Sequence, residues 1–122
     1  KNDVVKCLNL LDNKTDVVVT ITNASRSPYF NMVSEKDGYI KLLMESKEGF
    51  SRRQDTPLEY DMTTVAYVSR PSFIKNNNKV FDGQVRAALI PKERAVDIDD
   101  EIDFKVAEML MKEKQDKINA KK

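Results

Sequence analysis

The sequence has no histidine, no tryptophan and a single cysteine among its 122 residues. One cysteine cannot form an internal disulfide, and a chain without histidine cannot build a zinc site of the usual cysteine–histidine kind. The three glycines, Gly38, Gly49 and Gly83, stand far apart, so there is no glycine-rich loop to cradle a phosphate. We therefore expect neither a metal nor another cofactor.

Familiar catalytic groups are equally scarce. Without histidine, acid–base chemistry would fall to carboxylates, lysine or tyrosine. The one thiol, Cys7, lies close in sequence to Val5, Leu8 and Leu11. Apolar surroundings raise the pKa of a thiol and are typical of a buried structural cysteine. From these patterns we predict that the protein is not an enzyme.

Long hydrophobic runs are absent as well. No window approaches the length of a membrane span, and the first residues lack the apolar core of an export signal. Few cysteines fit a reducing compartment. We expect a cytoplasmic protein without membrane association, although an export signal removed earlier is an open alternative.

The composition that is present suits a folded domain. Hydrophobic residues make up 40% and charged residues 34%, with a net charge of +1. A chain of this length buries roughly two thirds of its surface on folding. We predict a single domain over residues 1–122, with a β-rich body at residues 1–96 and an amphipathic helix at residues 97–120.

Short strands dominate the predicted body. Residues 16–23 are rich in β-branched side chains and form the clearest strand. The first eleven residues fit a helix, with a strand as the alternative. Further strands are predicted at 29–33, 39–45, 58–69 and 79–90, with a turn at 35–38 and a bulge at Gly83. The fold class is α+β: a small, mainly antiparallel β-barrel, OB-like in one version, or a two-layer sheet, with a C-terminal helix.

The terminal helix carries several signals of its own. Carboxylates gather at its start, where Asp99 or Asp100 can cap it, and lysines gather at its end. We interpret the carboxylates of residues 97–103 as helix caps, not as a cation site. Ile102, Val106 and Met109 share one stripe, so the first three turns are expected to pack on the sheet. The second half is expected to stay free.

Two binding functions fit these patterns. The first is a protein–protein interaction or assembly subunit, of viral, phage or regulatory type, that binds a partner or a second copy. Adaptable methionine contacts and the lysine-rich end of the helix would carry this interaction. The expected contact residues are Met111, Lys112, Lys114, Lys117 and Ile118.

The alternative is binding of single-stranded nucleic acid. Such proteins hold phosphates with cations and stack bases on aromatic rings, and this chain mixes both kinds of side chain in its loops. The expected phosphate contacts are Arg52, Arg53, Arg70, Lys75 and Lys79, and the expected stacking residues are Phe50, Tyr67 and Phe73.

Overall fold

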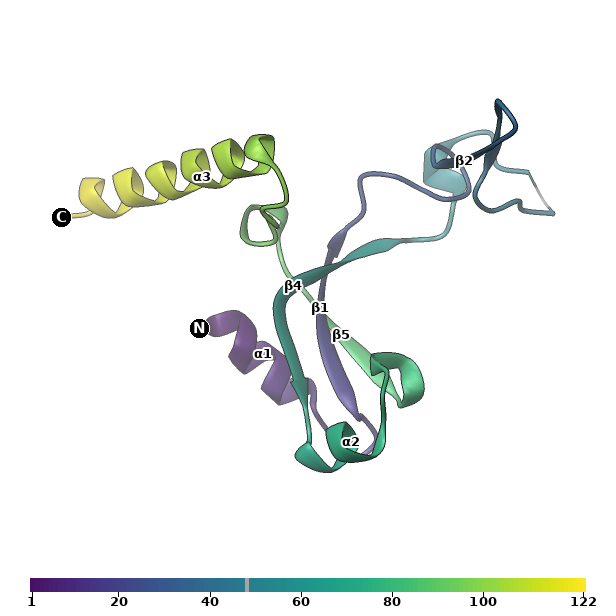
Figure 1. Cartoon of the computed structure of the whole chain (residues 1–122). Coiled ribbons are helices and arrows are strands. Elements are labelled where there is room, and N and C mark those ends of the chain that lie inside the picture. The colour runs from purple at the N-terminus through teal and green to yellow at the C-terminus, as the bar shows by residue number, and fades with distance from the viewer. Residues whose placement is uncertain (48) are drawn as a thin grey trace. The chain divides into compact units, whose positions relative to one another are not determined.

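The computed structural model describes residues 1–47 and 49–122. The chain forms two compact units: Lys1–Thr22 together with Met62–Lys122, and Asn23–Asp61. The helices and strands follow one another along the chain as shown in Figure 1. In order they are α1 (Asn2–Leu10), β1 (Val17–Asn23), β2 (Val33–Lys36), β3 (Tyr39–Leu42), β4 (Tyr60–Ser69), α2 (Pro71–Asn76), β5 (Val85–Leu89) and α3 (Glu101–Ala120). Short 3-10 turns lie at η1 (Arg53–Asp55), η2 (Val80–Asp82) and η3 (Lys92–Arg94).

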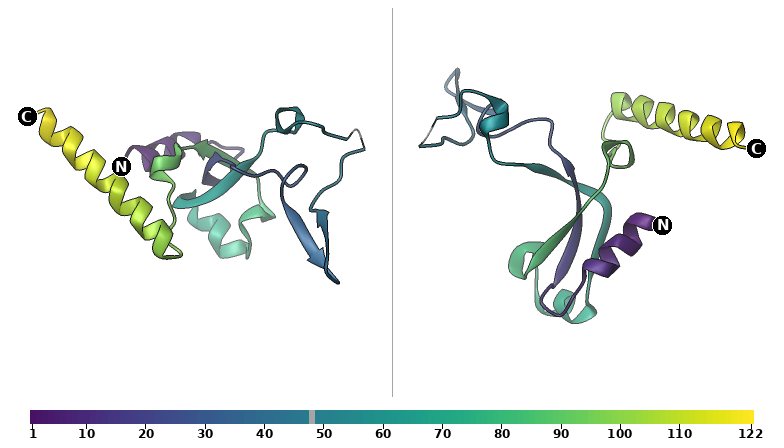
Figure 2. Two further views of the ribbon diagram at one scale, coloured as in Figure 1. Left: turned by 90° about the horizontal axis from the view of Figure 1, so that it is seen from above. Right: turned by 180° about the vertical axis from the view of Figure 1, so that it is seen from behind.

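A three-stranded sheet in the order β4-β1-β5 is the centre of the first unit. β1 and β5 run parallel, in a register from Val17 opposite Val85 to Ile21 opposite Leu89. β4 runs antiparallel to β1: Ser69 at the end of β4 lies beside the start of β1, where its hydroxyl donates to the carbonyl of Asp16. Figure 2 shows the three strands from above and from behind. The fold is α+β with a C-terminal helix, as predicted, but the described residues form no closed barrel and the sheet is mixed.

The core of this unit lies between α1 and the sheet. Cys7 of α1 packs with Val18 of β1 and Ala88 of β5, and all three are almost fully buried. Partly buried apolar residues surround them: Leu10, Leu11, Ala66 and Val68. Burial raises the pKa of the Cys7 thiol. Cys7 is therefore a core residue, as its apolar neighbours in the sequence predict.

The segment between β4 and β5 differs from the prediction. Proline at position 71 suggests the end of a strand, but it is also well suited to the first turn of a helix, where no N–H is needed. The chain uses it in the second way and forms α2. The strand predicted at 79–90 is shorter, because η2 occupies its start. Gly83 is not a bulge within a strand but a point of close contact, where an added Cβ would lie 2.5 Å from the ring of Phe73.

The second unit, Asn23–Asp61, contains a two-stranded antiparallel hairpin of β2 and β3. Asp37 and Gly38 both have positive φ, 54° and 82°, as the favoured two-residue hairpin turn requires. The predicted hairpin is confirmed, but its first strand is shifted. Residues 29–32 instead form turns, in which the Ser27 carbonyl accepts hydrogen bonds from the N–H groups of Phe30, Asn31 and Met32.

The terminal helix α3 begins where the sequence predicts. Asp100 is its N-cap, and its carboxylate accepts from the Asp103 N–H at 2.9 Å, while the Asp103 carboxylate reaches back to the Asp100 N–H. The expected packing of its first turns is wrong, however. Ile102 is 70% exposed and Phe104 57% exposed, and no residue of α3 is buried. Among the described helices, none is long and apolar enough to cross a membrane.

Candidate functional site

Three of the predicted nucleic-acid residues line one pocket in the first unit. Tyr67, Phe73 and Lys79 surround a space of about 270 Å³ near the start of β1 and the end of β4. Most of the lining is apolar, and the remaining members are Val17, Ser69, Ile74, Asn77, Asn78 and Val80. Lys75 lies on α2 outside this lining. The pocket offers an aromatic and aliphatic surface with one ammonium group at its border.

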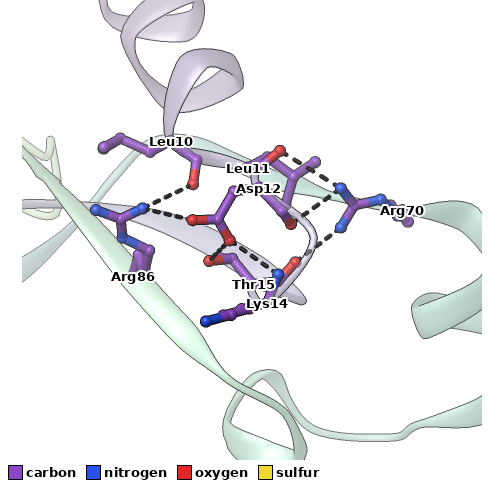
Figure 3. A network of polar contacts seen from close by, with 7 residues as sticks. All are labelled: Leu10, Leu11, Asp12, Lys14, Thr15, Arg70 and Arg86. Atoms are coloured by element: carbon purple, nitrogen blue, oxygen red, sulfur yellow. Dashed lines mark hydrogen bonds and ion pairs between the residues drawn. The ribbon is translucent and has the colours of Figure 1, made fainter.

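Arg70 serves the protein's own backbone. Its guanidinium donates to the carbonyls of Thr15 at 2.8 Å, Asp12 at 3.0 Å and Leu11 at 3.4 Å. A planar guanidinium can hold several acceptors at once, which a lysine ammonium cannot do in the same geometry. Arg70 therefore ties the end of β4 to the loop between α1 and β1 (Figure 3).

The other three predicted nucleic-acid residues belong to the second unit. The Phe50 ring meets the Tyr29 ring edge-on, with centroids 5.8 Å apart. The Arg53 guanidinium donates to the carbonyls of Ala24, at 2.9 Å, and Ser25. Arg52 is exposed and directly precedes η1. Phe50 and Arg53 thus organise the loops of their own unit.

Asp12 is the centre of the polar network in Figure 3. Its carboxylate accepts from the Thr15 hydroxyl at 2.8 Å, the Lys14 N–H at 2.9 Å and the Arg86 guanidinium at 3.1 Å. The hydrogen bonds from Thr15 and Lys14, and then the charge of Arg86, hold the pKa of Asp12 below its ordinary value of 3.8. Arg86 lies on β5, so the network fixes the loop that leads into β1 against the neighbouring strand.

This depressed pKa predicts a pH dependence. A carboxyl whose pKa is lower in the folded state adds stability above the pKa of the unfolded chain, and this stability is lost as the pH falls through the folded value. Between about pH 5 and about pH 3, the urea midpoint of the Asp12→Asn variant should therefore fall less than that of the unaltered protein. An Asp116→Asn variant, which removes an exposed carboxylate of α3, is the control. If the urea midpoint falls with pH by the same amount in the Asp12→Asn variant and in the unaltered protein, this role of Asp12 is contradicted.

The carboxyl ends of the parallel pair form a second candidate region. In open α/β sheets, ligands bind beyond the carboxyl ends of parallel strands. The ends of β1 and β5 lie side by side: Ile21 is opposite Leu89, and the next residue, Ile90, donates its N–H to the Ile21 carbonyl at 2.8 Å. The Lys6 ammonium donates to the Leu89 carbonyl at 2.6 Å, which places a cation of α1 at the end of β5.

The chain that follows β5 is tied to α1 by an ion pair. The Arg94 guanidinium makes two hydrogen bonds of 3.0 Å to the carboxylate of Asp3. The hydrogen bond from Arg94 lowers the pKa of Asp3. The described residues contain no group of three carboxylate or cysteine side chains arranged to hold a metal ion. Of the acidic residues at 97–103, Asp100 and Asp103 supply the carboxylates that cap α3.

The predicted partner residues of α3 lie on its surface. Met111 is 66% exposed and Ile118 is 45% exposed. Lys112 pairs with Glu108 one helical turn away, with 3.3 Å between the charged atoms. Lys114 and Met111 border a shallow depression beside Arg94. No contact of these residues identifies a partner.

Comparison with known proteins gives two informative relatives. The chain is 35% identical over 114 residues to a Campylobacter coli protein named post-translational flagellin modification protein B, a match that covers 92% of this chain and 47% of the relative. It is also 35% identical over 95 residues to the CMP-N,N'-diacetyllegionaminic acid synthase of Campylobacter jejuni, which covers 77% of this chain and 39% of that enzyme. The chain thus spans less than half the length of each relative. No family model matches it.

These relatives overturn the functional prediction made from the sequence. The expectation of a non-enzymatic binding or assembly module, with nucleic-acid binding as its alternative, is wrong, because the relatives point to sugar-nucleotide synthesis and flagellin modification. The prediction rested on the absence of histidine and of a glycine-rich phosphate loop. Neither absence excludes an enzyme whose chemistry uses other groups or residues from a longer polypeptide.

Proposed function

We propose that this chain is part of an enzyme that makes a CMP-linked acidic sugar of the legionaminic type, used to modify flagellin. The observation that carries the proposal is the similarity to the synthase over 77% of this chain. The similarity to the flagellin modification protein covers almost the whole chain and supplies the biological use.

The fold supports the proposal at the parallel strand pair. A CMP-sugar contains a phosphate, and in open α/β sheets such ligands lie beyond the carboxyl ends of parallel strands. In this chain β1 and β5 present that edge, with Lys6 at the end of β5. We propose this edge as the side from which the chain contributes to the nucleotide or sugar site. The pocket at Tyr67, Phe73 and Lys79 is near the opposite end of β1 and is assigned no part in it.

The experiment is a segment exchange. The 95-residue stretch of the C. jejuni synthase that matches this chain is replaced by the corresponding part of this chain. The purified chimera is incubated with CTP and N,N'-diacetyllegionaminic acid, and the CMP-sugar is measured by mass spectrometry. We expect product from the chimera and none from a synthase that lacks the segment. A chimera with the parent enzyme's circular dichroism that neither binds CTP nor forms product would contradict the proposal.

A further inference from the structure

One buried oxygen atom in the second unit lacks a hydrogen-bond partner. Among the side-chain nitrogen and oxygen atoms buried in the described part of the chain, this atom is Oε1 of Glu59. Folded proteins pair nearly all such atoms, because an acceptor taken out of water without a donor destabilises the fold. Glu59 directly precedes β4, and its backbone carbonyl accepts from the Ala24 N–H at 3.2 Å. The main chain of Glu59 is therefore held in place, while its side chain still needs a donor.

Glu59 borders an open space of about 490 Å³. The lining comes from Asn23 and Ala24, at the end of β1, and from residues 53, 54 and 56–59, which lead from η1 into β4. All of these residues belong to the second unit. The pocket at Tyr67 is mostly apolar, whereas this space is bordered by amide, carboxylate and guanidinium groups as well as by apolar side chains. It begins at the carboxyl end of β1, the end to which the proposed function assigns the nucleotide or sugar.

The polar groups of this space favour a ligand that donates hydrogen bonds. The Arg53 guanidinium donates to two backbone carbonyls just after β1, so its hydrogen bonds are directed at the protein itself. Asn23 and Gln54 are exposed and carry neutral amides, which both donate and accept. The carboxylate of Glu59 accepts only, and its negative charge repels a phosphate. This set suits the hydroxyl and amide N–H groups of a sugar.

We propose that Glu59 is a specificity-determining residue for the sugar: its carboxylate accepts a hydrogen bond from the N–H of an acetamido substituent lying in this space. The last side-chain torsion of glutamate is broad and twofold, so rotation about it can turn either oxygen toward the ligand. Hydrogen bonds to an ionised carboxylate are stronger than those between neutral groups. The inference rests on the proposed function, whose sugar carries two N-acetyl groups by name.

Two matched sugars test this role in the full chain. N,N'-diacetyllegionaminic acid has two amide N–H donors, and its di-O-acetyl analogue keeps the acetyl carbonyls but lacks both donors. In NMR titrations the chain should bind the first sugar at least about tenfold more tightly, the effect of one hydrogen bond to a charged group. Glu59→Ala should reduce this preference to about twofold or less. Asp55→Ala is the matched control, because Asp55 is a neighbouring carboxylate outside the lining, and this variant should keep the full preference.

The measured quantity is a ratio of two dissociation constants within one variant, so a lower folded fraction affects both sugars equally. An unchanged preference in Glu59→Ala would overturn the inference, and so would the absence of saturable sugar binding to the folded chain. Failure of the proposed function is distinguishable. An inactive chimera, together with a chain that prefers the diacetamido sugar through Glu59, would contradict the enzyme and retain the sugar site. An active chimera with a preference independent of Glu59 would overturn the role of Glu59 alone.

Discussion

Ile90→Ala should lower the free energy of unfolding by about 2–5 kcal/mol, the range for removing a large aliphatic side chain from a core. Ile90 is 1% exposed and is one of the largest fully buried side chains. It directly follows β5, and its N–H donates to the Ile21 carbonyl, so the neighbouring backbone is held and relaxes little into the cavity. Urea unfolding followed by circular dichroism measures the loss.

The matched control is Ile102→Ala on α3. Ile102 is 70% exposed, so truncation removes little buried surface and should change the free energy of unfolding by less than about 0.5 kcal/mol. Similar losses for the two variants would contradict the burial pattern, because they would mean that α3 packs on the domain as tightly as β5 does.

Gly83→Ala should cost about 1–3 kcal/mol through overpacking. The added Cβ would lie 2.5 Å from Asp16 Oδ2, 2.8 Å from Asp16 Cβ and 2.5 Å from the ring of Phe73. Asp16 cannot move away freely, because its carboxylate accepts the Gln84 N–H at 2.7 Å. The backbone of Gly83 is extended, so the cost is one of space and not of backbone conformation.

Gly38→Asn is the control for this substitution. Gly38 has φ of 82° and nothing within 4 Å of an added Cβ, and asparagine tolerates this conformation better than other residues. Thermal unfolding should show a lowered midpoint for Gly83→Ala and little change for Gly38→Asn. A Gly83→Ala protein as stable as the unaltered chain would show that Asp16 and Phe73 are not in close contact with Gly83.

Local signals in the sequence predicted the elements that depend on local physics. The β-branched run at residues 17–22 forms β1, and the carboxylates around Asp100 cap α3. The strand and the cap are each decided within a few residues, by side-chain shape and capping. Cys7 is buried as predicted, but mainly by Val18 and Ala88 of the distant strands, because Val5 and Leu8 are exposed.

The pairing of distant strands could not be predicted from the sequence. β1 and β5 lie more than sixty residues apart, and nothing in either strand distinguishes a parallel from an antiparallel neighbour. The Asp12–Arg86 ion pair depends on this pairing, and the three carbonyl contacts of Arg70 depend on β4 lying beside β1, so the spacing of these residues in the sequence does not predict them. Among the predicted nucleic-acid residues, Tyr67, Phe73 and Lys79 meet in one pocket, because β4, α2 and η2 follow each other closely in the chain.

The apolar stripe of α3 was misread for a related reason. A stripe at helical spacing indicates that a face will be buried, but it does not say against which surface. Ile102, Phe104 and Met109 remain exposed in this chain.

The most direct test of the account is CMP-sugar formation by the segment-exchange chimera. With CTP and N,N'-diacetyllegionaminic acid supplied, a chain that belongs to such an enzyme should restore synthesis to within about tenfold of the parent rate, a barrier difference of about 1.4 kcal/mol. A chimera that folds like the parent synthase but neither binds CTP nor makes CMP-sugar would contradict the account.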